Sequence, residues 1–153
     1  METVKPVPEE EQALTPHLVC RDAAKAIEFY RRAFGAEELF RLTEPTGKVG
    51  HAELRIADSR LMLADEYPDF GALSPASVGG TPVSLHLYVA DVDRAIERAT
   101  AAGATVLRPA KDEFYGDRAG MVADPFGHKW HLATKKEVLS AAEMQRRWDA
   151  MFE

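Results

Sequence analysis

The sequence predicts an α+β fold in which two β-α-β-β-β modules follow one another along the chain. Two similar stretches carry this prediction, HLVCRDAAKAIEFY at 17–30 and HLYVADVDRAIERA at 86–99. Both have His-Leu, an Asp five residues after the His, and Ala-Ile-Glu at matching positions, at a constant offset of 69 residues. The 153 residues are enough for one domain or for two half-size units that share a core.

Each stretch begins as a β-strand. LTPHLVC (14–20) and VSLHLYV (83–89) are rich in β-branched and apolar residues, which is typical of strands. Because side chains alternate between the two faces of a strand, His17 and His86 are expected on one face of their strands. The apolar neighbours of each histidine are expected on the other face.

A helix is expected after each strand. Asp22 and Asp91 precede apolar residues at helical spacing, and a carboxylate there accepts hydrogen bonds from the free N–H groups of the first turn. Gly35 and Gly103 are placed to end the two helices. We expect each helix to cover the apolar face of its sheet, which leaves the histidine face on the far side.

Three further strand signals follow each helix. They are EELFRLT, GHAELRIA and SRLMLAD in the first copy, and TVLRPAK, RAGMVAD and HKWHLAT in the second. The stretch between the copies is rich in Pro, Gly and Ser, which is typical of a linker. The predicted organisation is a mobile acidic tail at 1–12, a first module at 13–66, a linker or flap at 67–82, a second module at 83–135 and a C-terminal helix at 136–153.

The expected C-terminal helix carries an apolar stripe. Met144, Trp148 and Met151 recur at i, i+4 and i+7. Such a stripe usually packs against another surface. We expect that surface to be the sheet or a partner subunit.

Composition and charge argue against several classes of function. The formal net charge is −6 without a basic stripe, whereas nucleic-acid binding requires clustered Lys and Arg. No apolar run is long enough to span a bilayer, and the first residues lack the order of a secretory signal. The single Cys20 excludes an intrachain disulfide, so we expect a protein of the reducing cytoplasm.

The repeated motifs resemble those of the vicinal oxygen chelate superfamily, which includes glyoxalase I, bleomycin-resistance proteins and extradiol dioxygenases. The stretches RDAAKAIEFYRRAFGAEE, VADVDRAIERATAAGA and DPFGHKWHLAT carry the resemblance over roughly residues 13–135. FYRRAFGAEE with LMLADEYP is similar to the PhnB-like branch. The resemblance implies the glyoxalase/bleomycin-resistance fold, in which two modules form a curved mixed sheet around a cavity, and it implies a homodimer.

The resemblance also implies a place for a divalent metal. Family enzymes take ligands seven residues before each capping Asp and from the last strand of each module. These positions hold Thr15 and Ser84 on the first strands, and Met62 and His131 on the last. Hydroxyl and thioether groups are poor ligands for Zn²⁺ or Ni²⁺, so the sequence favours no metal over a bound Zn, Ni, Mn or Fe ion.

Two other histidines lie near those positions. His17 and His86 each follow a family ligand position by two residues. A step of two residues leaves the side chain on the same face of the strand and moves it about 6.5 Å along the strand. Together with His131 they are candidates for a shifted three-histidine metal site. The alternative is that they are hydrogen-bonding residues of the cavity wall.

Other polar residues are expected to line the same cavity. Glu53 is a candidate general base if its surroundings raise its pKa, and the alternative is an ion pair with Arg55, Arg118 or a histidine. Tyr88 and Tyr115 are candidate aromatic walls for a small ligand. The predicted ligand-binding residues are His17, Arg55, His86, Tyr88, Tyr115 and Arg118.

These residues leave three functions open. The first is a protein that binds a small molecule in its cavity without the full family metal site. The second is a metal-dependent lyase or isomerase of the superfamily, in which the metal acts as a Lewis acid. The third is a metal-free enzyme that uses Glu53 and the histidines as acid and base.

Overall fold

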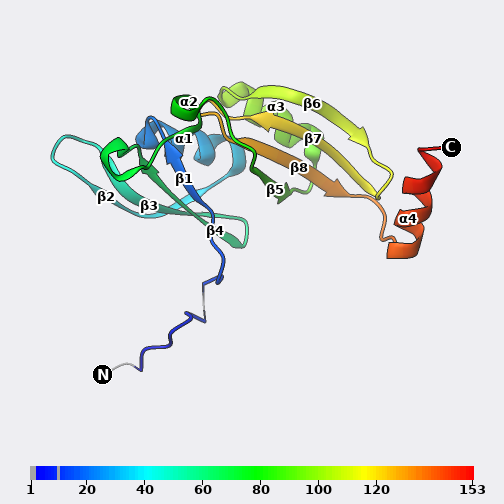
Figure 1. Ribbon diagram of the computed structural model, residues 1–153, viewed down its shortest axis with the longest axis horizontal. Coiled ribbons are helices and arrows are strands. Elements are labelled where there is room, and N and C mark those ends of the chain that lie inside the picture. The colour runs from blue at the N-terminus through cyan, green and yellow to red at the C-terminus, as the bar shows by residue number, and fades with distance from the viewer. Residues whose placement is uncertain (1–2, 10) are drawn as a thin grey trace. The chain divides into compact units, whose positions relative to one another are not determined.

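The computed structural model describes residues 3–9 and 11–153. The chain divides into two compact units, residues 1–80 and 81–153. Each unit contains one four-stranded mixed sheet with a helix between its first two strands (Figure 1). The predicted α+β class with two β-α-β-β-β modules is therefore confirmed.

The first unit has the strand order β1-β4-β3-β2. Strand β1 runs parallel to β4, and the remaining neighbours are antiparallel. Two short helices, η1 and α2, follow the last strand. The elements are β1 (His17–Cys20), α1 (Ala23–Phe34), β2 (Glu37–Thr43), β3 (Val49–Ile56), β4 (Ser59–Asp65), η1 (Pro68–Phe70) and α2 (Pro75–Val78).

The second unit repeats this topology with the order β5-β8-β7-β6. Strands β5 and β8 are parallel, and the other neighbours are antiparallel. A further helix, α4, follows the last strand. The elements are β5 (Ser84–Tyr88), α3 (Val92–Ala102), β6 (Thr105–Asp112), β7 (Asp117–Ala123), β8 (Lys129–Lys135) and α4 (Ala141–Ala150).

The two long helices begin and end where the sequence predicts. The Asp22 side chain accepts a hydrogen bond from the Lys25 N–H, and Asp91 does the same for Arg94. Gly35 ends α1 with a φ of 68°, a left-handed conformation that favours glycine. Gly103 ends α3.

One face of each sheet packs against its helix, as expected. In the first unit Leu18 and Cys20 are buried beneath α1. In the second unit α3 lies so close to β7 that a Cβ added at Gly120 would lie 2.7 Å from Ile96 Cδ1. The histidines alternate with the buried residues and therefore lie on the helix-free face.

The predicted C-terminal helix starts later than the sequence suggests, at Ala141, because Ser140 caps it by accepting from the Glu143 N–H. Residues 136–140 before it form neither helix nor strand, and the N–H groups of Lys136 and Glu137 both donate to the Gly116 carbonyl. From α4, Arg147 forms two hydrogen bonds of 3.0 Å with the Glu137 carboxylate. The helix is thereby fixed to the β6–β7 turn.

The expected tail, 1–12, has no helix or strand in residues 3–9, while residues 1, 2 and 10 lie outside the described part of the chain. Gln12 is attached to β4, since its side-chain amide donates to the Arg60 carbonyl at 3.0 Å and accepts from the Arg60 N–H at 2.9 Å. Among the residues that the structure describes, no helix combines the length and apolar character needed to cross a membrane.

The segment between the modules is organised around Glu66. Its carboxylate accepts a hydrogen bond from the Ser74 N–H at 2.7 Å and another from the Ser77 hydroxyl. Hydrogen bonds from Ser74 and then Ser77, with Arg21 nearby, lower the pKa of Glu66 to about 2. The charged carboxylate is therefore the form that holds α2.

This arrangement predicts an acid-dependent contribution to stability. A carboxyl group whose pKa is lower in the folded than in the unfolded state stabilises the fold above its unfolded pKa of about 4.3, and the contribution disappears as the pH falls. In urea unfolding, Glu66→Gln should lower the midpoint at pH 7, and the difference from the wild type should shrink steadily between pH 5 and pH 2.5. The exposed Glu97→Gln is the control. A Glu66→Gln deficit that does not change with pH would contradict this account.

Candidate functional site

The helix-free face of the second unit carries a row of four side chains across the sheet. Strand register pairs His86 with His131, His131 with Met121, and Met121 with Arg108. Directly paired residues of neighbouring strands project to the same face. The row therefore runs from an imidazole on β5 to a guanidinium on β6.

Three rings at the β5 end of this row form a cluster. The His86 ring centroid lies 4.9 Å from that of His131, at an interplanar angle of 75°, and 4.7 Å from that of Tyr88. These are edge-to-face contacts of the kind that aromatic rings favour. We call His86, Tyr88 and His131 the second-unit ring cluster.

A buried carboxylate fixes the Tyr88 ring. The Tyr88 hydroxyl donates to Asp117 Oδ2 at 2.9 Å, and Lys135 Nζ lies 3.4 Å from Asp117 Oδ1. Asp117 is only 3% exposed, whereas Tyr88 is 51% exposed. The hydrogen bond to Asp117, together with burial, raises the pKa of Tyr88. The result is a neutral phenol whose ring is half exposed and held in place.

The surroundings of His131 favour its neutral form. Burial is the main factor that lowers its pKa, and the nearby His86 and Arg108 lower it further. Since an ordinary histidine has a pKa of about 6.5, His131 is an uncharged imidazole at pH 7. It can offer one N–H donor and one nitrogen acceptor to a ligand.

Tyr115 lies in the β6–β7 turn, where its ring contacts that of Phe114 and Tyr88 is close enough to affect its pKa. Burial and the nearby carboxylates Glu113 and Asp117 raise the pKa of Tyr115. The turn is held from α4, because Arg147 donates to the Phe114 carbonyl at 3.1 Å and the Trp148 ring lies 5.6 Å from the Phe114 ring. Helix α4 thus positions the turn that carries Tyr115.

The first unit has a row at the equivalent place, with different chemistry. Register pairs His17 with Met62, Met62 with Glu53, and Glu53 with Phe40. The ring centroid of His51 lies 5.9 Å from that of His17 and 5.8 Å from that of Phe40. We call His17, Phe40 and His51 the first-unit ring cluster. Burial and the neighbouring His51 lower the pKa of His17.

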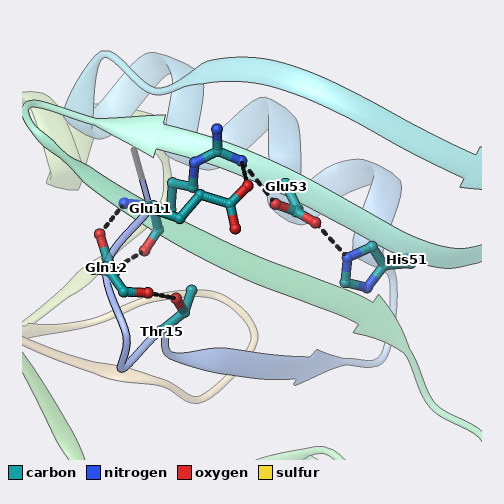
Figure 2. Close-up of polar contacts among 6 residues, drawn as sticks. Glu11, Gln12, Thr15, His51 and Glu53 are labelled. Atoms are coloured by element: carbon teal, nitrogen blue, oxygen red, sulfur yellow. Dashed lines mark hydrogen bonds and ion pairs between the residues drawn. The ribbon is translucent and has the colours of Figure 1, made fainter. Parts of the chain in front are cut away.

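Glu53 is paired rather than free. Its carboxylate accepts from His51 Nε2 at 3.0 Å and from Arg60 Nη1 at 3.1 Å, and Arg60 also lies 3.4 Å from Glu11 (Figure 2). The hydrogen bond from His51 is the largest influence, and with Arg60 it lowers the pKa of Glu53 although burial acts in the opposite direction. The pKa is therefore not raised, as a general base would require, and the ion-pair alternative describes this side chain.

Two predicted site residues have partners elsewhere. Arg55 lies 3.8 Å from Glu37. Arg118 is paired with Thr134 in the sheet, on the face opposite Asp117, and it holds Asp93 at 2.8 Å and Asp112 at 3.2 Å. Neither arginine belongs to the Glu53 network, where Arg60 takes the place expected for them.

Comparison with known proteins identifies the relatives of this fold. A model of the Glyoxalase/Bleomycin resistance protein/Dioxygenase superfamily matches residues 13–132. The chain belongs to this superfamily. It is 49% identical over 138 residues to the uncharacterized protein Rv0887c of Mycobacterium tuberculosis, covering 88% of this chain and 81% of that protein.

Solved structures of the glyoxalase/bleomycin-resistance type share the fold. The Arabidopsis thaliana protein At5g48480 superposes with a TM-score of 0.65 at 29% identity, covering 80% of this chain and 98% of that one. A PhnB protein from Bacillus cereus superposes with a TM-score of 0.62 at 20% identity, covering 80% and 99%. The superfamily and the fold inferred from the sequence are confirmed.

The family's metal positions hold a poor donor set in this superfamily member. Thr15 donates its hydroxyl to the Gln12 carbonyl at 3.4 Å, and Ser84 is paired with Lys129. Met62 offers only a thioether, which leaves His131 as a single strong ligand. Within residues 3–9 and 11–153, no three His, Cys, Asp or Glu side chains gather closely enough to hold a metal ion. The residues present do not fit the family's divalent site.

The structure brings together two of the three predicted histidines, His86 and His131, on adjacent strands. His17 lies in the first unit, opposite Met62. The convergence of all three on one cavity stays a prediction.

Several residues of the site were not singled out from the sequence. Asp117 and Lys135 follow the same alternation as Ala119 and His131, so period-2 spacing was enough to place them on this face. Arg108 could not be placed in this way, because the pairing of β6 with β7 shifts on both sides of it.

Proposed function

We propose that this superfamily member binds a small organic molecule with an aromatic ring, and that it does so without the divalent metal of the family enzymes. The observation that carries the proposal is the presence of a ring cluster on the helix-free face of each unit. Faces lined by aromatic side chains with a few polar groups are typical of small-molecule sites.

Tyr88 is the central residue of this proposal. Its ring is half exposed, while its hydroxyl is held by the buried Asp117. A ring that is already fixed loses little conformational entropy when a ligand stacks on it. Beside it lies a shallow depression of about 540 Å³ lined by Tyr88, Val89, Ala90, Thr134 and Lys135, a volume within the range of ligand pockets.

Metal-free acid–base catalysis has less support than binding. The lowered pKa of Glu53 makes this carboxylate a weak base at neutral pH. His51 and Arg60 also occupy its two oxygens. The proposal therefore treats Glu53 as a residue that organises the face of the first unit.

The metal-dependent lyase or isomerase is the second candidate, and the adjacent imidazoles of His86 and His131, with ring centroids 4.9 Å apart, favour it. Elemental analysis of protein purified without chelator discriminates the two candidates. The binding proposal predicts no stoichiometric Zn, Ni, Mn or Fe. One metal ion per chain that disappears in His131→Ala would establish the second candidate instead.

Thermal-shift screening with a panel of small aromatic compounds tests the binding proposal. A ligand at 100 times its Kd adds about 2.7 kcal/mol, which raises the Tm of a protein of this size by about 5–10 °C. Tyr88→Leu should weaken binding of the best ligand about fivefold, because ring contacts are worth about 1 kcal/mol. Phe70→Leu is the control, since that exposed ring lies outside both clusters.

Recovery of the ligand separates binding from catalysis. A hit that is recovered unchanged after incubation supports a binding protein, whereas conversion to a product would show an enzyme. A panel without any hit, or a hit that is indifferent to Tyr88→Leu and to substitution in the first-unit ring cluster, would contradict the proposal.

A further inference from the structure

We propose that the helix-free face of the second unit recognises an aromatic carboxylate. Arg108 would hold the carboxylate group, and His131 and Met121 would contact the ring. This inference rests on the proposed function and adds to it the chemical class of the ligand.

The first argument is the register of the row. Arg108 pairs with Met121, and Met121 pairs with His131. These three side chains therefore share one face and lie side by side. Two strand spacings, about 10 Å, separate Arg108 from His131, and the charge of Arg108 acts at the His131 imidazole. A single-ring acid can contact both ends.

The second argument is charge. Two other cations of this face are paired with carboxylates: Lys135 with Asp117 at 3.4 Å and Lys111 with Glu113 at 3.8 Å. Arg108 has no ion pair among the contacts of residues 3–9 and 11–153. Lys129, at the start of β8, shares this face and likewise has no ion pair within the described chain. Arg108 is the cation whose positive charge acts at His131 and Tyr115, where the carboxylates of Glu113 and Asp117 act in the opposite direction.

The third argument is the kind of anion that fits. A guanidinium binds a carboxylate through two parallel hydrogen bonds, which fixes both position and plane. The adjacent row of the sheet contains Tyr88, Ala133 and Ala119. Both alanines are buried, so the side chains of this face that a flat ring can contact are the half-exposed Tyr88 and the partly exposed His131 and Met121. The neutral His131 adds a hydrogen-bonding group without a second charge.

The first unit provides an internal comparison. The position equivalent to Arg108 in its row is Phe40, and the position equivalent to Met121 is Glu53. The face of the first unit thus carries a carboxylate where the second unit carries a thioether. We therefore assign recognition of the anionic group to the second unit.

Calorimetric titration of the full chain with benzoate tests this inference. Benzamide has the same shape without the charge, and cyclohexanecarboxylate has the charge without the aromatic ring. Benzoate should bind at least about tenfold more tightly than benzamide, because a hydrogen bond to a charged group is worth about 1.5–3 kcal/mol. It should bind about fivefold more tightly than cyclohexanecarboxylate, because aromatic ring contacts are worth about 1 kcal/mol. Arg108→Met should remove the preference for benzoate over benzamide. Arg94→Met, on the exposed surface of α3, should leave it unchanged.

The outcomes of this titration either support or overturn the assignment of Arg108 to a carboxylate. A benzoate preference that is lost in Arg108→Met and kept in Arg94→Met supports the inference. Equal binding of benzoate and benzamide, unaffected by Arg108→Met, would overturn the assignment of the carboxylate while leaving ring binding intact. Absence of benzoate binding would also overturn it, and the aromatic panel would then show separately whether the proposed function survives.

Discussion

Asp124→Ala should unfold at a much lower denaturant concentration than the wild type. The Asp124 carboxylate is buried and accepts three hydrogen bonds: from the Phe126 N–H at 2.9 Å, the His128 N–H at 3.0 Å and Trp130 Nε1 at 3.0 Å. Their loss leaves donors without partners, including the N–H of a buried indole. We expect a cost of about 3–5 kcal/mol in the free energy of unfolding, measured by urea titration.

Trp130→Phe is the matched control for this prediction, because it removes the indole hydrogen bond and keeps the two bonds within the turn. It should cost less than Asp124→Ala. The double variant should be more stable than the sum of the two losses implies, since both remove the same bond. If Asp124→Ala costs less than about 1 kcal/mol, the turn is not held in the way described.

Gly120→Ala should also destabilise the second unit. An added Cβ would lie 2.7 Å from Ile96 Cδ1, 2.9 Å from the Arg108 carbonyl oxygen and 3.0 Å from the Ala110 nitrogen. A side chain can move away, whereas the Arg108 and Ala110 contacts are with the backbone of β6, which is paired with β7 at Arg108 and Lys111. We expect a loss of about 1–3 kcal/mol, the usual cost of overpacking a core.

Ile96→Ala combined with Gly120→Ala separates the two clashes. Removing the isoleucine side chain beyond Cβ relieves the contact with Ile96 Cδ1 and leaves the contacts with Arg108 and Ala110. The double variant should therefore recover only part of the loss that Gly120→Ala causes, once the cost of Ile96→Ala alone is subtracted. A Gly120→Ala protein with an unchanged unfolding midpoint would show that α3 packs less closely than described.

Much of the fold could be predicted from the internal duplication. Asp22 and Asp91 cap their helices as their spacing indicates. One hydrogen bond is equivalent in the two units although the accepting residue differs. The N–H of the first helical residue donates to the Asp65 carboxylate in the first unit and to the Thr134 hydroxyl in the second, at 2.8 Å in both. The residue type differs, whereas the bond is the same, so sequence comparison of the two copies does not reveal it.

Less of the site could be predicted, because its contacts depend on strand register. Glu53 was expected to pair with Arg55, Arg118 or a histidine, and it pairs with His51 and with Arg60 on the neighbouring strand. Arg118 lies one residue from Asp117, and this single step places it on the opposite face. Arg108 reaches the row only through irregular pairing of β6.

The two ring clusters are not simple copies of one another. Only the first-strand histidines, His17 and His86, occupy equivalent positions. The other rings come from different strands, with Phe40 and His51 on β2 and β3 in the first unit, and Tyr88 and His131 on β5 and β8 in the second. Duplication alone therefore does not explain why rings gather on both helix-free faces, whereas the proposed ligand binding would explain it.

NMR of the histidine ring Cε1–H groups during titration with the best aromatic ligand is the most direct measurement of the central claim, that the helix-free face of the second unit binds a ring. The ring centroids of His86 and His131 lie 4.9 Å apart on that face, whereas His128 lies in the β7–β8 turn. The account predicts large, saturable shifts of the His86 and His131 signals, with His128 unchanged. Saturable binding that leaves both His86 and His131 unshifted would contradict it.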